Sequence, residues 1–200
     1  MNQRCLDAMA TPVITARGGE FRDVMADLNS GLRYAFNLTP SQPVKKTHSW
    51  SSEDDYKVMV VSGSGTAAME MLIANRFRSN DLVLVPTNGK FGERVAEMCK
   101  RFCNVKHIKY EWGRAFDLYE LEQQLERGCY EALLICHNET SSGITQDAPA
   151  IAEMCERYNT SFILDGITSI GGLPVHLEKW NVEAAAMGAQ KCTAGPSGIA

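Results

Sequence analysis

Short apolar runs alternate with amphipathic stretches along most of this 200-residue chain. The short runs are typical of buried strands, and the stretches between them repeat apolar residues every three or four positions, as helices with one buried face do. This alternation predicts an α/β fold of three layers, with a mostly parallel sheet and helices on both of its faces. The expected strands are 56–61, 82–86, 105–108, 132–136, 162–164 and 184–187, and the expected helices are 21–36, 66–77, 91–102, 118–125 and 148–158.

The N-terminal part differs from this rhythm. Residues 39–55 are polar and include Pro40 and Pro43, which predicts a surface loop. The run 56–61 that follows is expected to be a buried strand. We therefore expect an N-terminal helix and loop, residues 1–55, leading into a larger domain, residues 56–200.

Charge and composition narrow the function classes. Lys and Arg total 20 against 24 Asp and Glu, and no dense basic run extends beyond Lys45-Lys46, so we expect no nucleic acid partner. No stretch approaches the roughly 20 apolar residues of a membrane span, and the N-terminus has no apolar signal core. We expect a cytoplasmic protein that does not contact membranes.

The seven cysteines include no CxxC pair and no zinc-ligand spacing, which is typical of reduced intracellular thiols. Cys99 and Cys103 stand four positions apart, the spacing of one helix face, but no His or further Cys lies near them. Buried packing is expected for this pair and for Cys192, with no metal site. The histidines are expected to be solvated or structurally bonded; they are His48, His107, His137 and His176.

Three features that follow expected strands carry candidate chemistry. In the turn 62–66 (SGSGT), glycine allows the backbone to approach a phosphate, and the helix that begins there offers free N–H groups. A tight turn that needs glycine for its geometry is the alternative. Asp165 ends an apolar run, where an ionised carboxylate is costly without a cation or strong donor, although an ion pair or helix cap would also explain it. Lys191 lies in a small-residue loop with little other charge, so its amine is expected to be partly desolvated.

These features together meet the demands of pyridoxal 5'-phosphate. Its aldehyde needs an amine, its pyridine nitrogen needs an anion, and its phosphate needs backbone donors. Ile167 would project on the same side as Asp165 if the strand continued, and would then pack under a flat ring. A plain core isoleucine is the alternative.

Five segments in order resemble the class V aminotransferases of the fold-type I pyridoxal phosphate enzymes, particularly the alanine–glyoxylate, serine–pyruvate and archaeal aspartate aminotransferase branch. The resemblance covers nearly the whole chain and is carried by 62–66 (SGSGT), 88–94 (NGKFGER), 137–143 (HNETSSG), 165–172 (DGITSIGG) and 188–191 (GAQK).

The resemblance implies two catalytic residues. Lys191 would bind the cofactor aldehyde covalently and then act as general base and acid, and Asp165 would pair with the pyridine nitrogen. The implied reaction is a ping-pong transamination. Its substrates would be an amino acid of the alanine, serine or aspartate class and a 2-keto acid of the glyoxylate or pyruvate class.

The remaining implied residues contact the cofactor. Phe91, where many relatives have tryptophan, would stack on the ring, with Ile167 on the opposite side. Thr140 would hydrogen-bond near the polar edge of the ring. The phosphate would be held by Ser64, Gly65, Thr66 and Gln190.

The chain departs from the family pattern at its end. It stops at Ala200, whereas relatives continue into further strands and a C-terminal small domain that carries the arginine for the substrate carboxylate. The large domain is therefore expected to be incomplete, and the activity is expected to be impaired. Relatives are homodimers, so the resemblance also implies a homodimer.

Three alternatives stay open. A cysteine desulfurase shares the fold, but Gln190 and Phe91 stand where such enzymes typically carry histidine. A 2-aminoethylphosphonate transaminase differs mainly in substrate contacts outside this chain. A non-catalytic cofactor-binding or dimerisation fragment is the alternative from another class.

Overall fold

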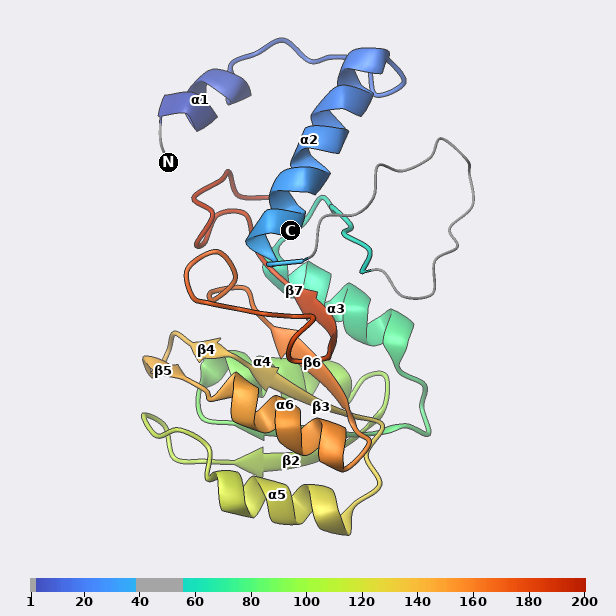
Figure 1. Cartoon of the computed structure of the whole chain (residues 1–200), viewed down its shortest axis with the longest axis vertical. Helices are drawn as coiled ribbons and strands as arrows, with labels where there is room; N and C mark the ends of the chain where they lie inside the picture. The colour runs from blue at the N-terminus through green and yellow to red at the C-terminus, as the bar shows by residue number, and fades with distance from the viewer. Residues whose placement is uncertain (1–2, 39–55) are drawn as a thin grey trace.

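The computed structural model describes residues 3–38 and 56–200, so the expected surface loop at 39–55 lies outside the described residues. The main sheet has five strands, all parallel, in the order β2-β1-β3-β6-β7 (Figure 1). These strands are β1 (Leu82–Thr87), β2 (Asn104–Lys109), β3 (Ala132–Cys136), β6 (Ser161–Asp165) and β7 (Val182–Ala186).

Helices cover both faces of this sheet, which confirms the predicted three layers. Along β3, Leu133 and Ile135 pack on one face with apolar residues of α5 (Leu118–Arg127) and α6 (Ala148–Arg157). Leu134 points to the other face and packs with α3 (Gly65–Arg76) and α4 (Lys90–Cys99). Successive strand residues therefore enter separate cores, and each fully buried Leu or Ile contributes roughly 1.5–3 kcal/mol.

Helices α5 and α6 begin where the sequence provides a capping side chain. Asp117, the predicted cap, accepts a hydrogen bond from the N–H of Glu120 at 3.1 Å and starts α5. Asp147 caps α6 in the same way through Ala150. These side chains satisfy N–H groups that have no acceptor within the helix.

Two further helices precede the sheet: α1 (Gln3–Met9), which was not expected, and α2 (Gly19–Ala35), which matches the predicted helix at 21–36. In Figure 1, α1 and the start of α2 lie at one end of the molecule, and α2 runs from there toward the sheet. Leu32 and Phe36 pack against the core on the α5–α6 face. No helix within the described ranges is long and apolar enough to cross a membrane.

The prediction of a buried strand at 56–61 is wrong. The segment is extended, but only Val61 pairs with another backbone, exchanging hydrogen bonds of 2.8 and 3.0 Å with Ala200. Its residues are half-buried or exposed in alternation. A strand needs a neighbouring strand for its N–H and C=O groups, and an apolar run does not reveal whether one is present.

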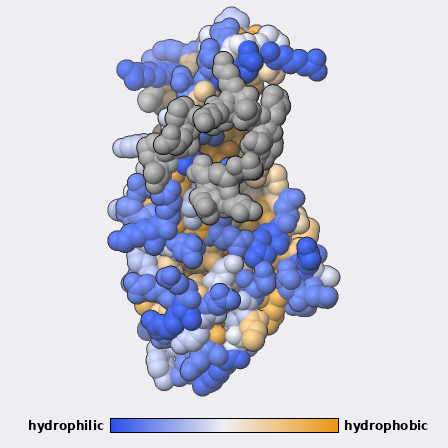
Figure 2. Space-filling view, turned by 45° about the vertical axis from the view of Figure 1, so that its right-hand side comes forward, coloured by the Kyte–Doolittle hydropathy of each residue, from blue (hydrophilic) through white to orange (hydrophobic). Residues whose placement is uncertain are grey.

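An apolar groove of about 1180 Å³ lies along this segment, between α2, α3 and β7. Hydrophobic surface is visible in the middle of the molecule in Figure 2. The groove is lined mainly by apolar residues, with a few polar ones such as Asp27, Lys57 and Glu183, and it includes none of the residues expected to bind a cofactor.

Candidate functional site

The segments expected to carry chemistry follow the carboxyl ends of parallel strands, which lie at one edge of the sheet. Segment 88–94 follows β1, 137–143 follows β3, 165–172 begins at the last residue of β6, and 188–191 follows β7. Ligands of open α/β sheets bind at this edge, so the fold brings these four segments to a common site.

The glycine turn forms the N-terminus of α3. Ser64 is the cap, and its Oγ accepts a hydrogen bond from the N–H of Ala67 at 3.2 Å. Gly65 and Thr66 follow as the first helical residues, whose N–H groups have no acceptor within the helix. This end of α3 can therefore donate to an anion.

Ile167 joins the glycine turn to the end of β7. A Cβ built on Gly65 would lie 2.8 Å from Ile167 Cδ1, and one built on Gly188 would lie 3.5 Å from Ile167 Cγ2. The same position on Gly188 is 3.7 Å from Lys191 Cγ and 3.1 Å from Gln190 Oε1. Three segments far apart in the sequence therefore meet around one isoleucine.

The condition under which Ile167 would share a side with Asp165, that the strand continues to it, is not met. Strand β6 ends at Asp165, and Ile167 lies in the turn that follows. The chain turns because the N–H of Ile167 donates to Asp165 Oδ1 at 3.0 Å, which bends the backbone back on the carboxylate. Ile167 still reaches the site, but through this turn.

Asp165 is a buried carboxylate, with 6% of its surface exposed. Burial raises its pKa to about 6, with a smaller upward contribution from Glu139, while the Ile167 N–H and Arg94 act in the opposite direction. Within residues 3–38 and 56–200 no cation forms an ion pair with it. A positively charged partner would relieve the cost of this burial.

Lys191 and Gln190 are exposed, so the expected partial desolvation of the lysine is wrong. The turn that carries them folds on itself, because Ala189 O accepts hydrogen bonds from the N–H of Gly195 at 2.7 Å and from Thr193 Oγ1 at 2.8 Å. The side chain of Lys191 lies in contact with water on this turn.

Phe91 is the second residue of α4 and is half-buried. The guanidinium of Arg94 lies over its ring, 5.0 Å from the centroid, and Nη1 donates to Thr66 Oγ1 at 3.4 Å. Arg94 belongs to the segment 88–94, but sequence reasoning gave it no role. It connects the aromatic residue to the glycine turn.

Sequence reasoning gave a role to Thr140 but did not predict the hairpin that holds it, β4 (Asn138–Glu139) and β5 (Ile144–Thr145). Thr140 lies exposed in the turn between these strands. Glu139 is fully buried, and its Oε2 accepts a hydrogen bond from the N–H of Gly92 in α4 at 2.8 Å. An acidic residue three positions after a strand of five buried residues was the available signal.

Cysteines 99 and 103 pack as expected, although they do not share a helix. Cys99 ends α4, and Cys103 Sγ contacts Cys99 O at 3.3 Å; both are buried. Burial raises the pKa of Cys99 to about 12, so the thiol stays protonated. The described residues contain no group of three or more potential metal ligands, and the absence of a metal site stays a prediction.

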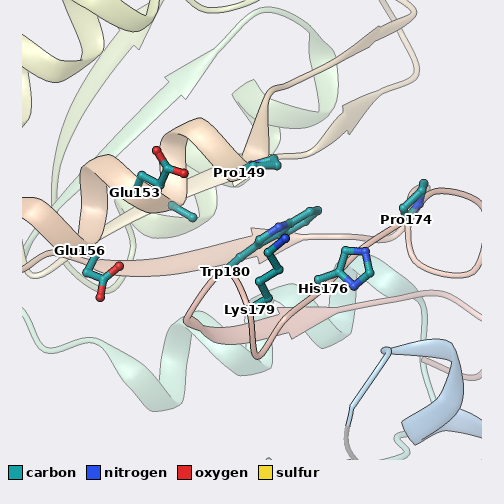
Figure 3. A pocket seen from close by; sticks show the side chains of 8 residues that line it. Pro149, Glu153, Glu156, Pro174, His176, Lys179 and Trp180 are labelled. Atoms are coloured by element: carbon teal, nitrogen blue, oxygen red, sulfur yellow. The ribbon is translucent and has the colours of Figure 1, made fainter.

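A second, smaller cleft of about 360 Å³ lies between α6 and the segment before β7, and none of the expected site residues lines it (Figure 3). His176 and Trp180 meet there edge to face, with ring centroids 5.8 Å apart. The buried His137 meets Trp180 in the same way, and burial lowers its pKa to about 4. Both imidazoles therefore have structural contacts.

Comparison with known proteins establishes the family. The family model for aminotransferase class-V matches residues 43–200, most of the chain. The chain therefore belongs to the class-V aminotransferase family.

Three relatives illustrate the similarity. The (S)-ureidoglycine–glyoxylate transaminase of Bacillus subtilis is 30% identical over 100% of this chain and 45% of its own. The crystal structure of alanine–glyoxylate aminotransferase from Nostoc has a TM-score of 0.87 at 32% identity, over 99% of this chain and 49% of that one. The structure of aspartate aminotransferase from Thermus thermophilus has a TM-score of 0.84 at 32% identity, over 100% of this chain and 52% of that one. The chain spans about half the length of the curated relatives it matches.

Proposed function

We propose that this chain forms the cofactor-binding part of an aminotransferase that transfers an amino group from an amino acid to a 2-keto acid with the help of pyridoxal 5'-phosphate. The observation that carries the proposal is the meeting of Gly65 and Gly188 around Ile167, beside the buried Asp165, with Lys191 close to Gly188. Family membership supports the same reaction.

The residues present fit this cofactor. Asp165 is a buried carboxylate whose pKa is raised by its burial, and a protonated pyridine nitrogen would give it a cationic partner. The first turn of α3 supplies donors for a phosphate, and Gln190 lies near Gly188. The cofactor itself would supply an aldehyde that takes up an amine and a ring that accepts the electron pair left at the substrate Cα.

The chain's own residues then have distinct tasks. Lys191 Nζ would hold the cofactor aldehyde and, once released from it, move the proton at the Cα of the amino acid. The exposure of Lys191 leaves room for this movement. Asp165 would keep a proton on the ring nitrogen, while Phe91 and Ile167 would hold the ring between them and Thr140 would bind near its polar edge.

The substrates are proposed from the relatives. Their names pair glyoxylate with ureidoglycine or alanine, and a solved relative is an aspartate aminotransferase, which supports an amino donor of the alanine or aspartate class and glyoxylate as acceptor. Serine as donor and pyruvate as acceptor are proposed from the resemblance of the sequence motifs alone. The matched cysteine desulfurase structure is only 16% identical, so it supports the shared fold alone.

Release of keto acid tests this function. The chain loaded with pyridoxal 5'-phosphate is mixed with L-alanine, without an acceptor, and pyruvate is measured with lactate dehydrogenase. We expect up to one pyruvate per cofactor, and continued turnover once glyoxylate is added.

With both substrates varied, parallel lines in the double-reciprocal plot support a ping-pong order, and intersecting lines would exclude it. Cofactor binding without any pyruvate would favour the non-catalytic alternative, and turnover of 2-aminoethylphosphonate alone would favour the phosphonate transaminase.

We also propose that the chain self-associates and works in the cytoplasm. The apolar groove beside β7 supports association, because contiguous apolar surface is typical of interfaces. The cysteines among the described residues are all free, which suits a reducing compartment. A sedimentation profile of a single monomeric species would contradict the proposed association.

A further inference from the structure

We propose that Asn138 and Glu139, the two residues of β4, are positioning residues that fix the two sides of the cofactor slot relative to each other. The inference rests on the proposed function, because the slot is the space that Phe91 and Ile167 would share with a cofactor ring. Neither residue needs to touch the cofactor. Each acts through the backbone that carries one side of the slot.

Glu139 holds the first turn of α4, which carries Phe91. Its Oε2 accepts from the N–H of Gly92 at 2.8 Å, and its Oε1 accepts from Ser141 Oγ at 2.6 Å and from the Ser141 N–H at 3.0 Å. Ser141 Oγ in turn accepts from the N–H of Lys90 at 2.8 Å. The backbone N–H groups on both sides of Phe91 are therefore bound to one hydrogen-bonded unit.

The fit of this unit against α4 is close. A Cβ built on Gly89, which precedes α4, would lie 2.4 Å from Glu139 Cγ and 2.6 Å from Ser141 Oγ. Glu139 is also completely shielded from solvent. Among residues 3–38 and 56–200 no cation forms an ion pair with Glu139, and the carboxylate is stabilised by donors and by the positive end of α4.

Asn138 holds the opposite side. Its Nδ2 donates to Thr168 Oγ1 at 3.1 Å, and Thr168 Oγ1 donates to Asn138 O at 2.7 Å. Thr168 directly follows Ile167. The amide of Asn138 is itself oriented by Thr145 of β5, whose Oγ1 donates to Asn138 Oδ1 at 2.8 Å.

The consequence follows from strand geometry. Successive side chains of a strand point to opposite sides, so adjacent residues of β4 reach α4 and the turn after β6. The distance between Phe91 and Ile167 is therefore fixed through two consecutive residues. A change in either one would let one side of the slot move without unfolding the sheet.

The test compares four variants with matched controls. Glu139→Gln keeps the shape but replaces one accepting oxygen with a donor, and Glu139→Ala removes both oxygens. Gly89→Ala keeps the carboxylate but pushes it away, and Asn138→Ala releases Thr168. Asp117→Ala is the control for a lost helix cap, at the remote α5. Asn104→Ala, which loses a hydrogen bond to Ser79 O at the sheet edge, is the control for a lost asparagine contact.

The first measurement is the dissociation constant of pyridoxal 5'-phosphate, alongside the melting temperature. We expect Glu139→Gln, Gly89→Ala and Asn138→Ala to weaken binding roughly tenfold, the usual effect of losing a buried hydrogen-bond partner, and Glu139→Ala to weaken it more. The controls are expected to melt earlier by a similar amount with unchanged affinity. If affinity in the β4 variants falls no more than in controls of equal melting temperature, the proposal is wrong.

A second measurement needs no cofactor. With 4-fluorophenylalanine at position 91, the chain without any other substitution is expected to give one ¹⁹F resonance. This resonance should shift or split in Glu139→Gln and stay in place in Asp117→Ala. An unchanged resonance in Glu139→Gln would overturn the proposal. Failure of the unmodified chain to bind pyridoxal 5'-phosphate would count against the proposed function, and the ¹⁹F spectra would then decide the positioning role.

Discussion

Ile167 packs directly on Gly65, so closely that a Cβ at position 65 would lie 2.8 Å from Ile167 Cδ1 and 2.9 Å from its Cγ1. The first helical position of α3 therefore has to be glycine for the isoleucine to stay where it is. The contact links the end of the helix that offers donors for a phosphate to the residue proposed to support the ring. The two parts of the proposed site cannot shift independently.

Gly65→Ala tests this contact. Ile167 would have to move, and overpacking of this kind predicts roughly tenfold weaker binding of pyridoxal 5'-phosphate. The free energy of unfolding should change by less than about 1 kcal/mol, because alanine also favours the helix. Gly31→Ala in α2, where nothing lies within 4 Å of the added Cβ, is the control and should leave affinity unchanged. Equal affinities in the two variants would show that the contact does not matter.

Asp165 makes stability depend on pH. Burial raises its pKa from 3.8 to about 6 in the folded chain, so between these values the unfolded chain is ionised while the folded chain keeps its proton. Stability therefore falls as pH rises through this window and stays lower above it, by roughly 3 kcal/mol.

Asp165→Asn removes this penalty. At pH 8 the variant is expected to be roughly 2–3 kcal/mol more stable than the unmodified chain, and the gain should disappear below pH 4. Urea unfolding of the cofactor-free chain at both pH values measures this. The variant should also bind pyridoxal 5'-phosphate more weakly, since the anion facing the ring nitrogen is gone. A gain of the same size at both pH values would contradict the account.

Arg76 anchors the other end of α3 without contributing to the proposed site. Its guanidinium bonds Glu131 at 2.8 Å and also pairs with Glu183 of β7, whose hydrogen bond raises the pKa of Arg76. Arg76→Met is expected to lose about 1 kcal/mol of stability at low salt and less at 1 M NaCl, because these side chains are partly exposed.

Affinity for pyridoxal 5'-phosphate should not change in Arg76→Met. Arg114→Met is the matched control, since its ion pair with Glu111 is far more exposed and should contribute nothing measurable. Denaturant unfolding at two salt concentrations distinguishes the variants. A loss independent of salt would indicate that packing of Arg76, rather than its charge, anchors the helix.

The sequence was sufficient to predict the layers of the fold, because the spacing of apolar residues along the chain distinguishes strands from helices. Strand β3 has the predicted bounds, since an apolar run is the pattern of a strand buried on both faces. The run 56–61 has a similar composition but lacks a continuous partner, which depends on segments far away in the chain. Hairpin β4–β5 could not be found from periodicity, since two-residue strands have no repeat.

The candidate site was predicted less completely. Asp165 and the glycine turn were recognised because a buried charge and a strand–turn–helix junction are visible in sequence. The exposure of Lys191 was missed, because it depends on how the turn around Ala189 folds on itself. The buried role of Glu139 and the contacts of Arg94 were also missed, because both depend on which helix lies opposite.

The measurement that tests the central claim most directly is covalent capture of the cofactor. The chain is incubated with pyridoxal 5'-phosphate, dialysed, reduced with borohydride and mapped by peptide mass, beside Lys191→Ala and, as control, Lys179→Ala. We predict a cofactor absorbance band and a label on Lys191 in the unmodified chain and in Lys179→Ala, and neither in Lys191→Ala. A label on another lysine, or equal labelling of Lys191→Ala, would contradict the assignment of Lys191 as the residue that binds the cofactor.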